Sequence, residues 1–543
     1  MFCNQCEETL NQTGCVKSGV CGKTSEVSDL QDLLIFNLKG IAMLIDKIEI
    51  NDGDYEKDYF FILQGLFTTV TNVNFDEQRM FDLLNKSVDI KNKYVKILKQ
   101  SLSNKYKDIN EFYLWVPENK SLKTYLDKAK EIVLPNKLSD AESLSELLLY
   151  GLKGMAAYAY HAYVLNYSSH EVKKFIIKAL SYLTNEEKNF DVLLNLVTEC
   201  GKVGVNVMET LDKANTEHYG EPEPTKVLNG TKHGKSILIS GHDLYELEKL
   251  LIQTENKNIN VYTHGEMLPA HAYPFFKRFS HFIGNYGGAW WEQEKEFAEF
   301  KGSIIMTTNC IKKPLETYKN RIFTTDMVAM PGVKHIANHD FSEAINTALN
   351  SEEMPENIKG TIDVGFARQT LVNSADAIIK MVEEGKIKKF VVMAGCDSND
   401  KERVYYSELA SRLSNDSVIL TAGCAKYRYN RMNLGNIDGL PRVIDAGQCN
   451  DSYSLAVAAL KLKEKLNLND INALPIYYEI AWYEQKAVIV LLALLYLGVK
   501  NIRLGYKLPA FLSENMADFL VKNFNIMAVS NVEDSLKYIN GNR

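Results

Sequence analysis

The stretch Ser417-Val418-Ile419-Leu420-Thr421-Ala422-Gly423-Cys424 combines a short apolar run with a glycine and a cysteine at its end. A short β-branched run that stops at a glycine predicts a buried strand, so Cys424 would stand where that strand ends. Further runs of this kind follow residue 235, and helical stretches separate them. Strands that alternate with helices are typical of an α/β sheet. The other runs are Ser236–Ser240, Asn258–Thr263, Ser303–Thr308, Lys389–Ala394, Arg442–Asp445 and Asn501–Leu504.

The chain that precedes these strands has a helical pattern. From residue 25 to about residue 215, apolar residues recur at spacings of three and four, which predicts amphipathic helices. The clearest segments are Leu30–Ile48, Phe81–Leu102, Ser143–Leu165 and Val172–Leu194. Leu33–Ala42 (LLIFNLKGIA) is also similar to Leu147–Ala156 (LLLYGLKGMA), and the shared Leu-Lys-Gly favours a duplication over chance similarity. We therefore expect two related helical bundles.

Two polar stretches, Gly220–Pro224 and Ser351–Thr361, divide the chain. The predicted fold class is a multidomain α and α/β protein, in which N-terminal helical bundles are followed by two Rossmann-like α/β domains. The expected domains are residues 1–220, with a cysteine-containing loop and the duplicated bundles, residues 221–359 and residues 360–543.

Length and composition exclude other classes of protein. The chain has 543 residues, of which 46% are hydrophobic and 24% charged, and its formal net charge is −7. This composition is that of a globular protein, and the acidic balance argues against a nucleic-acid partner. The longest apolar run, Ala487–Val499, is shorter than the ~20 residues of a membrane span, so we expect a buried helix and no membrane partner. Cys3 comes too early for a secretory signal to precede it, which predicts a cytoplasmic protein.

Nine cysteines in a protein expected in a reducing compartment indicate metal or redox chemistry rather than disulfides. Four of them stand in the pattern Cys3-x2-Cys6-x8-Cys15-x5-Cys21. Four thiolates in a short loop suit zinc or an iron–sulfur cluster, and the spacing alone leaves both open.

The remaining candidates follow the predicted strands. In open α/β sheets, ligands bind beyond the carboxyl ends of the strands. Six strand ends deliver a possible metal ligand: His242, Glu266, Cys310, Cys396, Cys424 and Cys449. A lone cysteine after a strand is more often a small buried hydrophobic residue. Four such cysteines, with a histidine and a glutamate in equivalent places, instead predict one metal site between two α/β domains that face each other.

Several motifs match a known family. Met1-Phe2-Cys3-Asn4-Gln5-Cys6-Glu7-Glu8-Thr9 resembles the start of the hybrid cluster proteins, also called prismane proteins or hydroxylamine reductases. The resemblance spans nearly the whole chain. It continues through Thr13–Cys15, Val20–Lys23, Leu30–Leu34, Thr263–Pro269, Asn285–Trp290, Val392–Asp397, Thr421–Arg428 and Trp482–Ala487.

The resemblance implies two clusters. A [4Fe-4S] cluster would be held by Cys3, Cys6, Cys15 and Cys21. A hybrid [4Fe-2O-2S] cluster at the domain junction would be held by His242, Glu266, Cys310, Cys396, Cys424, Cys449 and Glu484, with a persulfide on Cys396. Cys200 matches no ligand and is expected to be a buried structural thiol, while His264 and His271 are expected beside the site or in the core.

The implied activity is the anaerobic reduction of hydroxylamine to ammonia and water with two electrons and two protons. Glu484 would carry protons as well as bind iron, and Lys486 would donate a proton, although i and i+2 in a helix do not share a face. A lysine on a solvated surface is the alternative for Lys486. No dinucleotide-binding motif is apparent in the sequence, so a redox protein is expected to deliver the electrons.

Other functions remain open from the sequence. Nitric oxide reduction at the same cluster, as protection from nitrosative stress, needs the same labile iron. A redox sensor or a protein that transfers nitrosyl groups is a non-enzymatic alternative. A nickel carbon monoxide dehydrogenase is disfavoured by carboxylates at two of the ligand positions, Glu266 and Glu484.

Overall fold

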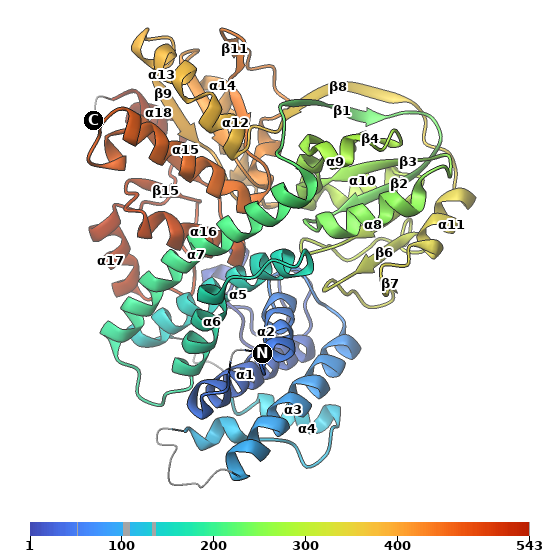
Figure 1. The fold of residues 1–543 in the computed structure, drawn as a ribbon, viewed down its shortest axis with the longest axis vertical. Helices are drawn as coiled ribbons and strands as arrows, with labels where there is room; N and C mark the ends of the chain where they lie inside the picture. The colour runs from blue at the N-terminus through green and yellow to red at the C-terminus, as the bar shows by residue number, and fades with distance from the viewer. Residues whose placement is uncertain (52, 101–108, 133–136, 542–543) are drawn as a thin grey trace.

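The computed structural model describes residues 1–51, 53–100, 109–132 and 137–541. A helical region, blue to green in Figure 1, lies below two regions that contain sheets. Its long helices are α1 (Ser25–Ile48), α2 (Glu56–Thr68), α3 (Glu77–Gln100), α4 (Leu122–Ala129), α5 (Asp140–Val164), α6 (His170–Tyr182) and α7 (Phe190–Tyr219). No helix in these ranges is long and apolar enough to cross a bilayer.

Helices α1 and α5 contain the two copies of the repeated motif, and every residue of both copies is buried except the half-buried Lys39. The glycine shared by the two copies has a packing role in each. A Cβ atom on Gly154 would lie 2.3 Å from the backbone oxygen of Gln485, and one on Gly40 would lie 2.8 Å from that of Tyr113. Each copy therefore uses its glycine to let another backbone approach the helix.

One predicted helix is wrong in its extent. The apolar pattern of Val172–Leu194 predicted a single helix, but α6 ends at Tyr182 and α7 begins at Phe190. Asn189 caps α7 by accepting a hydrogen bond from Val192 N at 3.1 Å. The apolar spacing continues from α6 into α7 because both helices bury an apolar face. The spacing alone does not detect the capping residue between them. The end of Phe81–Leu102 lies outside the described residues, and the other predicted helices are found within five residues of their expected bounds.

The first sheet has eight strands in the order β7-β6-β5-β2-β3-β4-β1-β8. All neighbours pair in parallel except β1 and β8, which are antiparallel, so the sheet is mixed. Its strands are β1 (Thr225–Thr231), β2 (Lys235–Ser240), β3 (Ile259–His264), β4 (Phe282–Asn285), β5 (Ser303–Met306), β6 (Ile322–Thr325), β7 (Lys334–Ile336) and β8 (Asn357–Val364). Strand β8 crosses residues 359 and 360, so this sheet extends to Val364.

The second sheet has five parallel strands in the order β13-β10-β9-β14-β15. They are β9 (Lys389–Val392), β10 (Ser417–Thr421), β13 (Val443–Asp445), β14 (Ile476–Ile480) and β15 (Ile502–Leu504). The short strands β11 (Asn436–Ile437) and β12 (Leu440–Pro441) form a separate pair.

Shorter helices connect and cover the two sheets (Figure 1). Helix α16 packs against α5 and α7 and so joins the second sheet region to the helical region. These helices are α8 (Leu244–Thr254), α9 (Pro274–Lys277), α10 (Gln293–Glu299), α11 (Ser342–Asn350), α12 (Arg368–Asn373), α13 (Ala375–Glu383), α14 (Val404–Arg412), α15 (Ser452–Lys465), α16 (Gln485–Tyr496), α17 (Glu514–Phe524) and α18 (Val532–Asn540).

Every predicted strand is present, but the sequence missed others. Two of the missed strands lie at the edges of the first sheet, where β8 is largely exposed and β7 is partly exposed. Edge strands need only one pairing partner and carry polar residues, so they lack a continuous apolar run. Strand β14 is buried along its whole length, and it leads directly to the segment that contains Glu484.

Candidate metal centres

The four N-terminal cysteines lie together in one loop. Cys3 and Cys15 exchange backbone hydrogen bonds of 3.0 and 2.8 Å, which closes the loop between them. Burial raises the pKa of the Cys6 thiol well above its usual value, and the neighbouring Cys3, Cys21 and Cys15 raise it further. Thiols that mutually oppose ionisation are stabilised as thiolates when a cationic centre binds among them.

This cysteine loop is attached to the segment after β14. The Glu7 backbone N–H donates to the Tyr483 carbonyl at 3.0 Å, and the Gln485 side chain donates to the Gln5 carbonyl at 2.5 Å. The carboxylate of Glu7 also forms a fully buried ion pair with Arg403. The residues on either side of Glu484 therefore contact the N-terminal loop directly.

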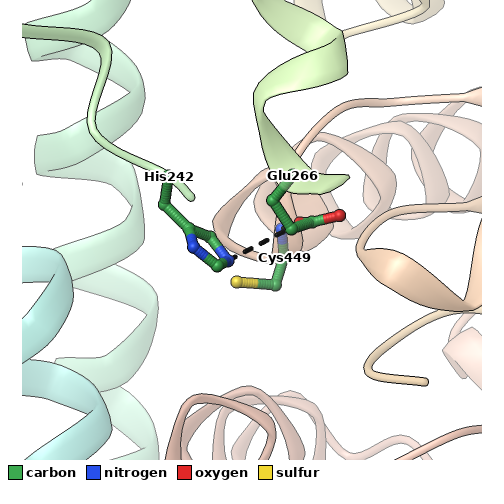
Figure 2. A group of neighbouring side chains, drawn as sticks. All are labelled: His242, Glu266 and Cys449. Carbon is green, nitrogen blue, oxygen red and sulfur yellow. Dashed lines mark hydrogen bonds and ion pairs between the residues drawn. The ribbon is translucent and has the colours of Figure 1, made fainter. Parts of the chain in front are cut away.

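The second group of candidates meets where strands of both sheets end. His242 follows β2, Glu266 follows β3 and Cys449 follows β13. One possible ligand atom from each of the three lies within 4.8 Å of the others, and all three residues are buried (Figure 2). His242 Nε2 is 3.9 Å from Glu266 Oε2, which accepts a hydrogen bond from Cys449 N at 3.0 Å.

The other three cysteines of the second group are held by unusual backbone. Cys310 has a φ of 76°, a left-handed conformation that costs a non-glycine residue about 1–3 kcal/mol. Gly395 and Gly423 stand directly before Cys396 and Cys424, and a Cβ atom on Gly423 would lie 2.5 Å from the Gly395 carbonyl oxygen. Only glycine allows these two strand ends to approach so closely.

The thiols of the second group lie near enough to oppose one another's ionisation. Burial raises the pKa of Cys396 well above its usual value, with further contributions from Glu484, Cys449 and Cys310. Burial likewise raises the pKa of Cys424, with contributions from Glu266, Cys310 and Cys396. The predicted ligand residues of both sheets are thus electrostatic neighbours in one buried region.

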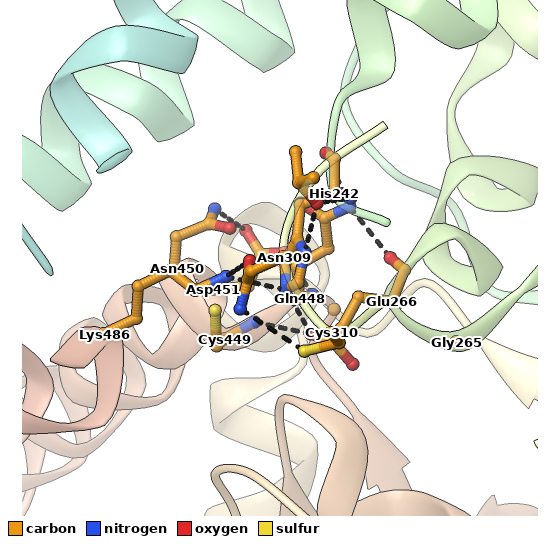
Figure 3. Close-up of polar contacts among 12 residues, drawn as sticks. His242, Gly265, Glu266, Asn309, Cys310, Gln448, Cys449, Asn450, Asp451 and Lys486 are labelled. Carbon is orange, nitrogen blue, oxygen red and sulfur yellow. Dashed lines mark hydrogen bonds and ion pairs between the residues drawn. The ribbon is translucent and has the colours of Figure 1, made fainter. Parts of the chain in front are cut away.

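Lys486 also points into this region, and the alternative of a solvated lysine is wrong. Its side chain is 2% exposed, and Nζ lies 3.0 Å from His242 Nε2 and 2.7 Å from Asn309 Oδ1 (Figure 3). Burial alone would lower the pKa of Lys486, but the charges of Cys449, Glu484 and the other thiols outweigh it and raise this pKa.

Glu484 and Lys486 face the same place despite their i and i+2 spacing. Glu484 is not inside α16 but caps it with extended backbone, at φ −139° and ψ −175°. Its Oε2 accepts from Lys486 N at 2.7 Å, and its Oε1 lies 3.6 Å from Lys486 Nζ. The rule that residues two apart diverge applies to positions within a helix, and the cap position escapes it.

Sequence reasoning missed several polar residues of the site. Asn309 bridges three candidates, because its amide nitrogen donates to Cys310 Sγ at 3.3 Å and to Glu484 Oε1 at 3.4 Å, while its oxygen accepts from Lys486. Tyr158 of α5 donates to Cys449 Sγ at 3.2 Å. The position of Asn309 beside Cys310 could have indicated its role, but no spacing in the sequence connects Tyr158 with residue 449.

Three residues without a predicted ligand role have other contacts. His264 lies within hydrogen-bond distance of Ser240 Oγ and Glu296, and His271 stacks on Phe282. Cys200 is fully buried in the core of the helical region, and burial raises its pKa. These contacts agree with the expected core or supporting positions.

The residues present fit metal clusters at both places. All nine cysteines are free thiols. Glu266 Oε1 is buried and has no hydrogen-bond partner among the described residues, which would leave an unsatisfied polar atom. An iron ion accepts thiolate, imidazole and carboxylate donors together, so a metal at this position would satisfy it.

Comparison with known sequences gives full-length matches. The profile of the Prismane/CO dehydrogenase family matches residues 1–537. A hydroxylamine reductase of Caldanaerobacter subterraneus subsp. tengcongensis is 52% identical over 100% of both chains. Proteins of the same name from Thermoanaerobacter pseudethanolicus and Methanosarcina mazei are 52% and 50% identical, again over 100% of both chains.

Comparison with solved structures finds a similar fold in carbon monoxide dehydrogenases. Carbon monoxide dehydrogenase IV from Carboxydothermus hydrogenoformans superposes with a TM-score of 0.57 at 13% identity, covering 99% of this chain and 91% of that one. A nickel-free carbon monoxide dehydrogenase from Thermococcus sp. AM4 gives 0.56 at 15% identity, covering 99% and 90%. At such low identity these matches concern the fold alone.

Proposed function

The chain belongs to the Prismane/CO dehydrogenase family, and from this premise we propose that it is a hydroxylamine reductase. The reaction is NH2OH + 2 e⁻ + 2 H⁺ → NH3 + H2O. The observation that carries the proposal is the buried Lys486, which is hydrogen-bonded to His242 and Asn309 among the candidate ligands. A fixed proton donor beside a metal site is what cleavage of an N–O bond requires.

We propose that two iron–sulfur clusters are the cofactors. Cys3, Cys6, Cys15 and Cys21 would hold a [4Fe-4S] cluster. The hybrid [4Fe-2O-2S] cluster would be held by His242, Glu266, Cys310, Cys396, Cys424, Cys449 and Glu484, with a persulfide on Cys396. When bound, this cluster supplies electrons and Lewis-acidic iron. Because some of its ligands would be oxygen and nitrogen atoms of the protein, coordination positions on the iron would remain open to exchange.

The protein's own residues would supply protons and orientation. Lys486 keeps its proton because the thiols and Glu484 raise its pKa, and Asn309 fixes its direction. Glu484 Oε1 is 3.6 Å from Lys486 Nζ, close enough for a proton to pass between them after a small movement. The His242 backbone N–H and ring Nδ1 both contact Thr308 Oγ1, at 2.7 and 2.9 Å, which orients the ring toward Glu266.

Electrons would enter through the N-terminal cysteine loop. Gln5 and Glu7 flank Cys6 and contact Gln485 and Tyr483, the neighbours of Glu484. Two hydrogen bonds therefore connect the backbone on either side of Cys6 with the residues on either side of Glu484. We further propose the cytoplasm as the compartment and a division into a helical and two Rossmann-like domains.

The test is anaerobic turnover with reduced methyl viologen. Purified holoenzyme is expected to oxidise two viologen cations per hydroxylamine and to release one ammonia, and iron and sulfide analysis should account for two distinct clusters. Negligible hydroxylamine consumption by protein that contains both clusters would reject this function.

A second candidate is the reduction of nitric oxide, 2 NO + 2 e⁻ + 2 H⁺ → N2O + H2O. An almost entirely apolar pocket, bounded by residues of α15, α16 and the second sheet, reaches Cys396 and Cys449. A pocket of this character favours a small uncharged molecule such as nitric oxide over the more polar hydroxylamine. Comparing the two substrates under the same reductant distinguishes the candidates, because rapid N2O formation without hydroxylamine turnover would favour the second.

A sensor or nitrosyl-transfer protein is the non-enzymatic alternative. Glu484→Ala separates it from an enzyme, because it removes a candidate iron ligand and leaves the N-terminal cysteines intact. Loss of turnover with the N-terminal cluster retained is expected for an enzyme. Unchanged turnover would remove Glu484 from the mechanism.

A further inference from the structure

The N-terminal cysteine loop carries exposed apolar side chains. Leu10, Val16 and Val20 are 44%, 51% and 54% exposed, and each lies within six residues of a candidate iron ligand. Isolated exposed apolar residues are common, but a group on one loop at a redox site indicates a contact surface.

The same loop forms one wall of a hollow that is open to solvent. Leu10, Val20 and Cys21 line this wall, and the hollow has a volume of about 610 Å³. The hollow is also lined by Trp290, Ile311, Lys312, Lys313 and Lys507. Cys21 thus lies at the edge of a depression large enough to receive part of another protein. We call this hollow, together with Val16 and Lys17, the docking surface.

The charges of this surface favour an acidic partner. Lys312 is paired with Glu294 at 2.9 Å, and Lys507 with Asp400 at 2.8 Å, so these charges are balanced locally. Lys17 and Lys313 are exposed and have no ion-pair partner among the described residues. Although the whole chain has a net charge of −7, this surface presents two uncompensated positive groups.

The remaining acidic group of the hollow faces inward. Glu8 is within hydrogen-bond distance of Asn399 N and Tyr483 Oη, both at 3.4 Å. Glu8 is half-buried and both of its carboxylate oxygens accept hydrogen bonds from the protein, so it faces an acidic partner less than an exposed, unpaired carboxylate would. The surface therefore combines exposed apolar side chains, two lysines without an ion-pair partner among the described residues and a candidate cluster ligand.

We propose that this surface docks the electron donor, and that the donor is a small acidic redox protein whose own cofactor lies near its surface. The inference rests on the proposed function, because it assumes a cluster on the N-terminal cysteines. Leu10, Val16 and Val20 provide the dry centre of the contact. Lys17 and Lys313 steer the acidic partner into it.

The test measures electron transfer to the protein in stopped flow, as the bleaching of iron–sulfur absorbance in anaerobic holoenzyme. One reductant is a reduced two-cluster bacterial ferredoxin as the acidic probe, and the other is reduced methyl viologen. The apolar variant combines Leu10→Ser, Val16→Ser and Val20→Ser. The charge variant combines Lys17→Glu and Lys313→Glu.

Matched controls carry the same changes on other surfaces. Ile252→Ser, Ile358→Ser and Val192→Ser remove apolar side chains that are 46%, 53% and 40% exposed. Lys359→Glu and Lys500→Glu reverse two exposed lysines on other elements. Neither control touches the docking surface or the two candidate metal centres.

Both docking variants are expected to be reduced by ferredoxin at least about tenfold more slowly than their controls, with viologen rates within twofold. The ferredoxin rate of the charge variant should also depend less on ionic strength. Equal ferredoxin rates in variants and controls would overturn the proposal. The readout here is the rate of cluster reduction and not hydroxylamine turnover. If the wild-type protein did not turn over hydroxylamine, the proposed function would be contradicted, but the comparison of ferredoxin rates would still test the docking surface.

Discussion

The two groups of cysteines in this protein differ in how they are built. The N-terminal group comes from a continuous segment, residues 3 to 21, and offers sulfur alone beside an open hollow. The second group comes from strand ends of two sheets, spread over residues 242 to 484, and it adds nitrogen and oxygen donors in a buried place. An all-sulfur site near the surface suits electron entry, and a buried site with mixed donors and a fixed lysine suits chemistry.

The largest effect is expected from Lys486→Met, which removes the proton donor while keeping the length of the side chain. We expect kcat with reduced viologen to fall by about 10²- to 10⁴-fold, the usual contribution of a general acid. Because its surroundings raise the pKa of Lys486, the wild-type lysine should stay protonated up to about pH 10.

Lys153→Met is the matched control for this change. Lys153 is also buried, but it donates to Gln5 Oε1 at 2.9 Å beside the N-terminal group. Its variant should keep viologen-driven kcat within a few-fold of wild type. An equal fall in kcat in the two variants would show that proton donation does not distinguish the second group from the N-terminal group.

The next effect concerns the connection between the two sites. Arg403→Met leaves the buried carboxylate of Glu7 without its partner. Breaking a buried ion pair on one side costs about 3–5 kcal/mol, so the midpoint of denaturant unfolding should fall. A double variant with Glu7→Gln should recover part of that loss. If Arg403→Met unfolds at the wild-type midpoint, the pair does not hold the cysteine loop in place.

A smaller effect is expected from Glu266→Gln, which preserves shape but removes the charge of one candidate ligand. Iron bound at the second group should weaken by at least about 10- to 100-fold, and the N-terminal cluster should keep its spectrum. Glu296→Gln is the control, since Glu296 contacts His264 at 3.0 Å and is no candidate ligand. Loss of both clusters together in Glu266→Gln would argue that the sites are not independent.

Cys200→Ala should have the smallest effect. Cys200 is fully buried near Gly151, where an added Cβ atom would lie 2.8 Å from its sulfur. Removing one buried sulfur should lower the free energy of unfolding by about 1 kcal/mol without changing iron content or turnover. A loss of iron in this variant would mean that Cys200 takes part in cluster binding or assembly.

The sequence predicted the parts of the fold that have a simple period. Strands in the middle of a sheet are buried on both faces, so β2, β5, β9 and β10 appear as apolar runs. The exposed edge strand β8 has no such run and was missed. The break between α6 and α7 was missed for the opposite reason, because the apolar period continues across it.

The same distinction holds for the site. The glycines before Cys396 and Cys424 marked the strand ends, and the structure explains them by close backbone contact. The buried position of Lys486 could not be predicted from periodicity, because it depends on Glu484 acting as a helix cap. Asn309 contacts Glu484 and Tyr158 contacts Cys449, and no local sequence pattern predicts contacts between residues so far apart in the chain.

By itself, the sequence determined the kinds of atom available and the strand ends that present them, because ligand chemistry and strand burial are local properties of residues. Only the tertiary structure decided which of these atoms meet. It brings His242, Glu266 and Cys449 within 4.8 Å, buries Lys486 among them and leaves Cys21 beside the open hollow. The physical reason is that proximity between distant segments is set by the packing of helices and sheets, which depends on the whole chain at once.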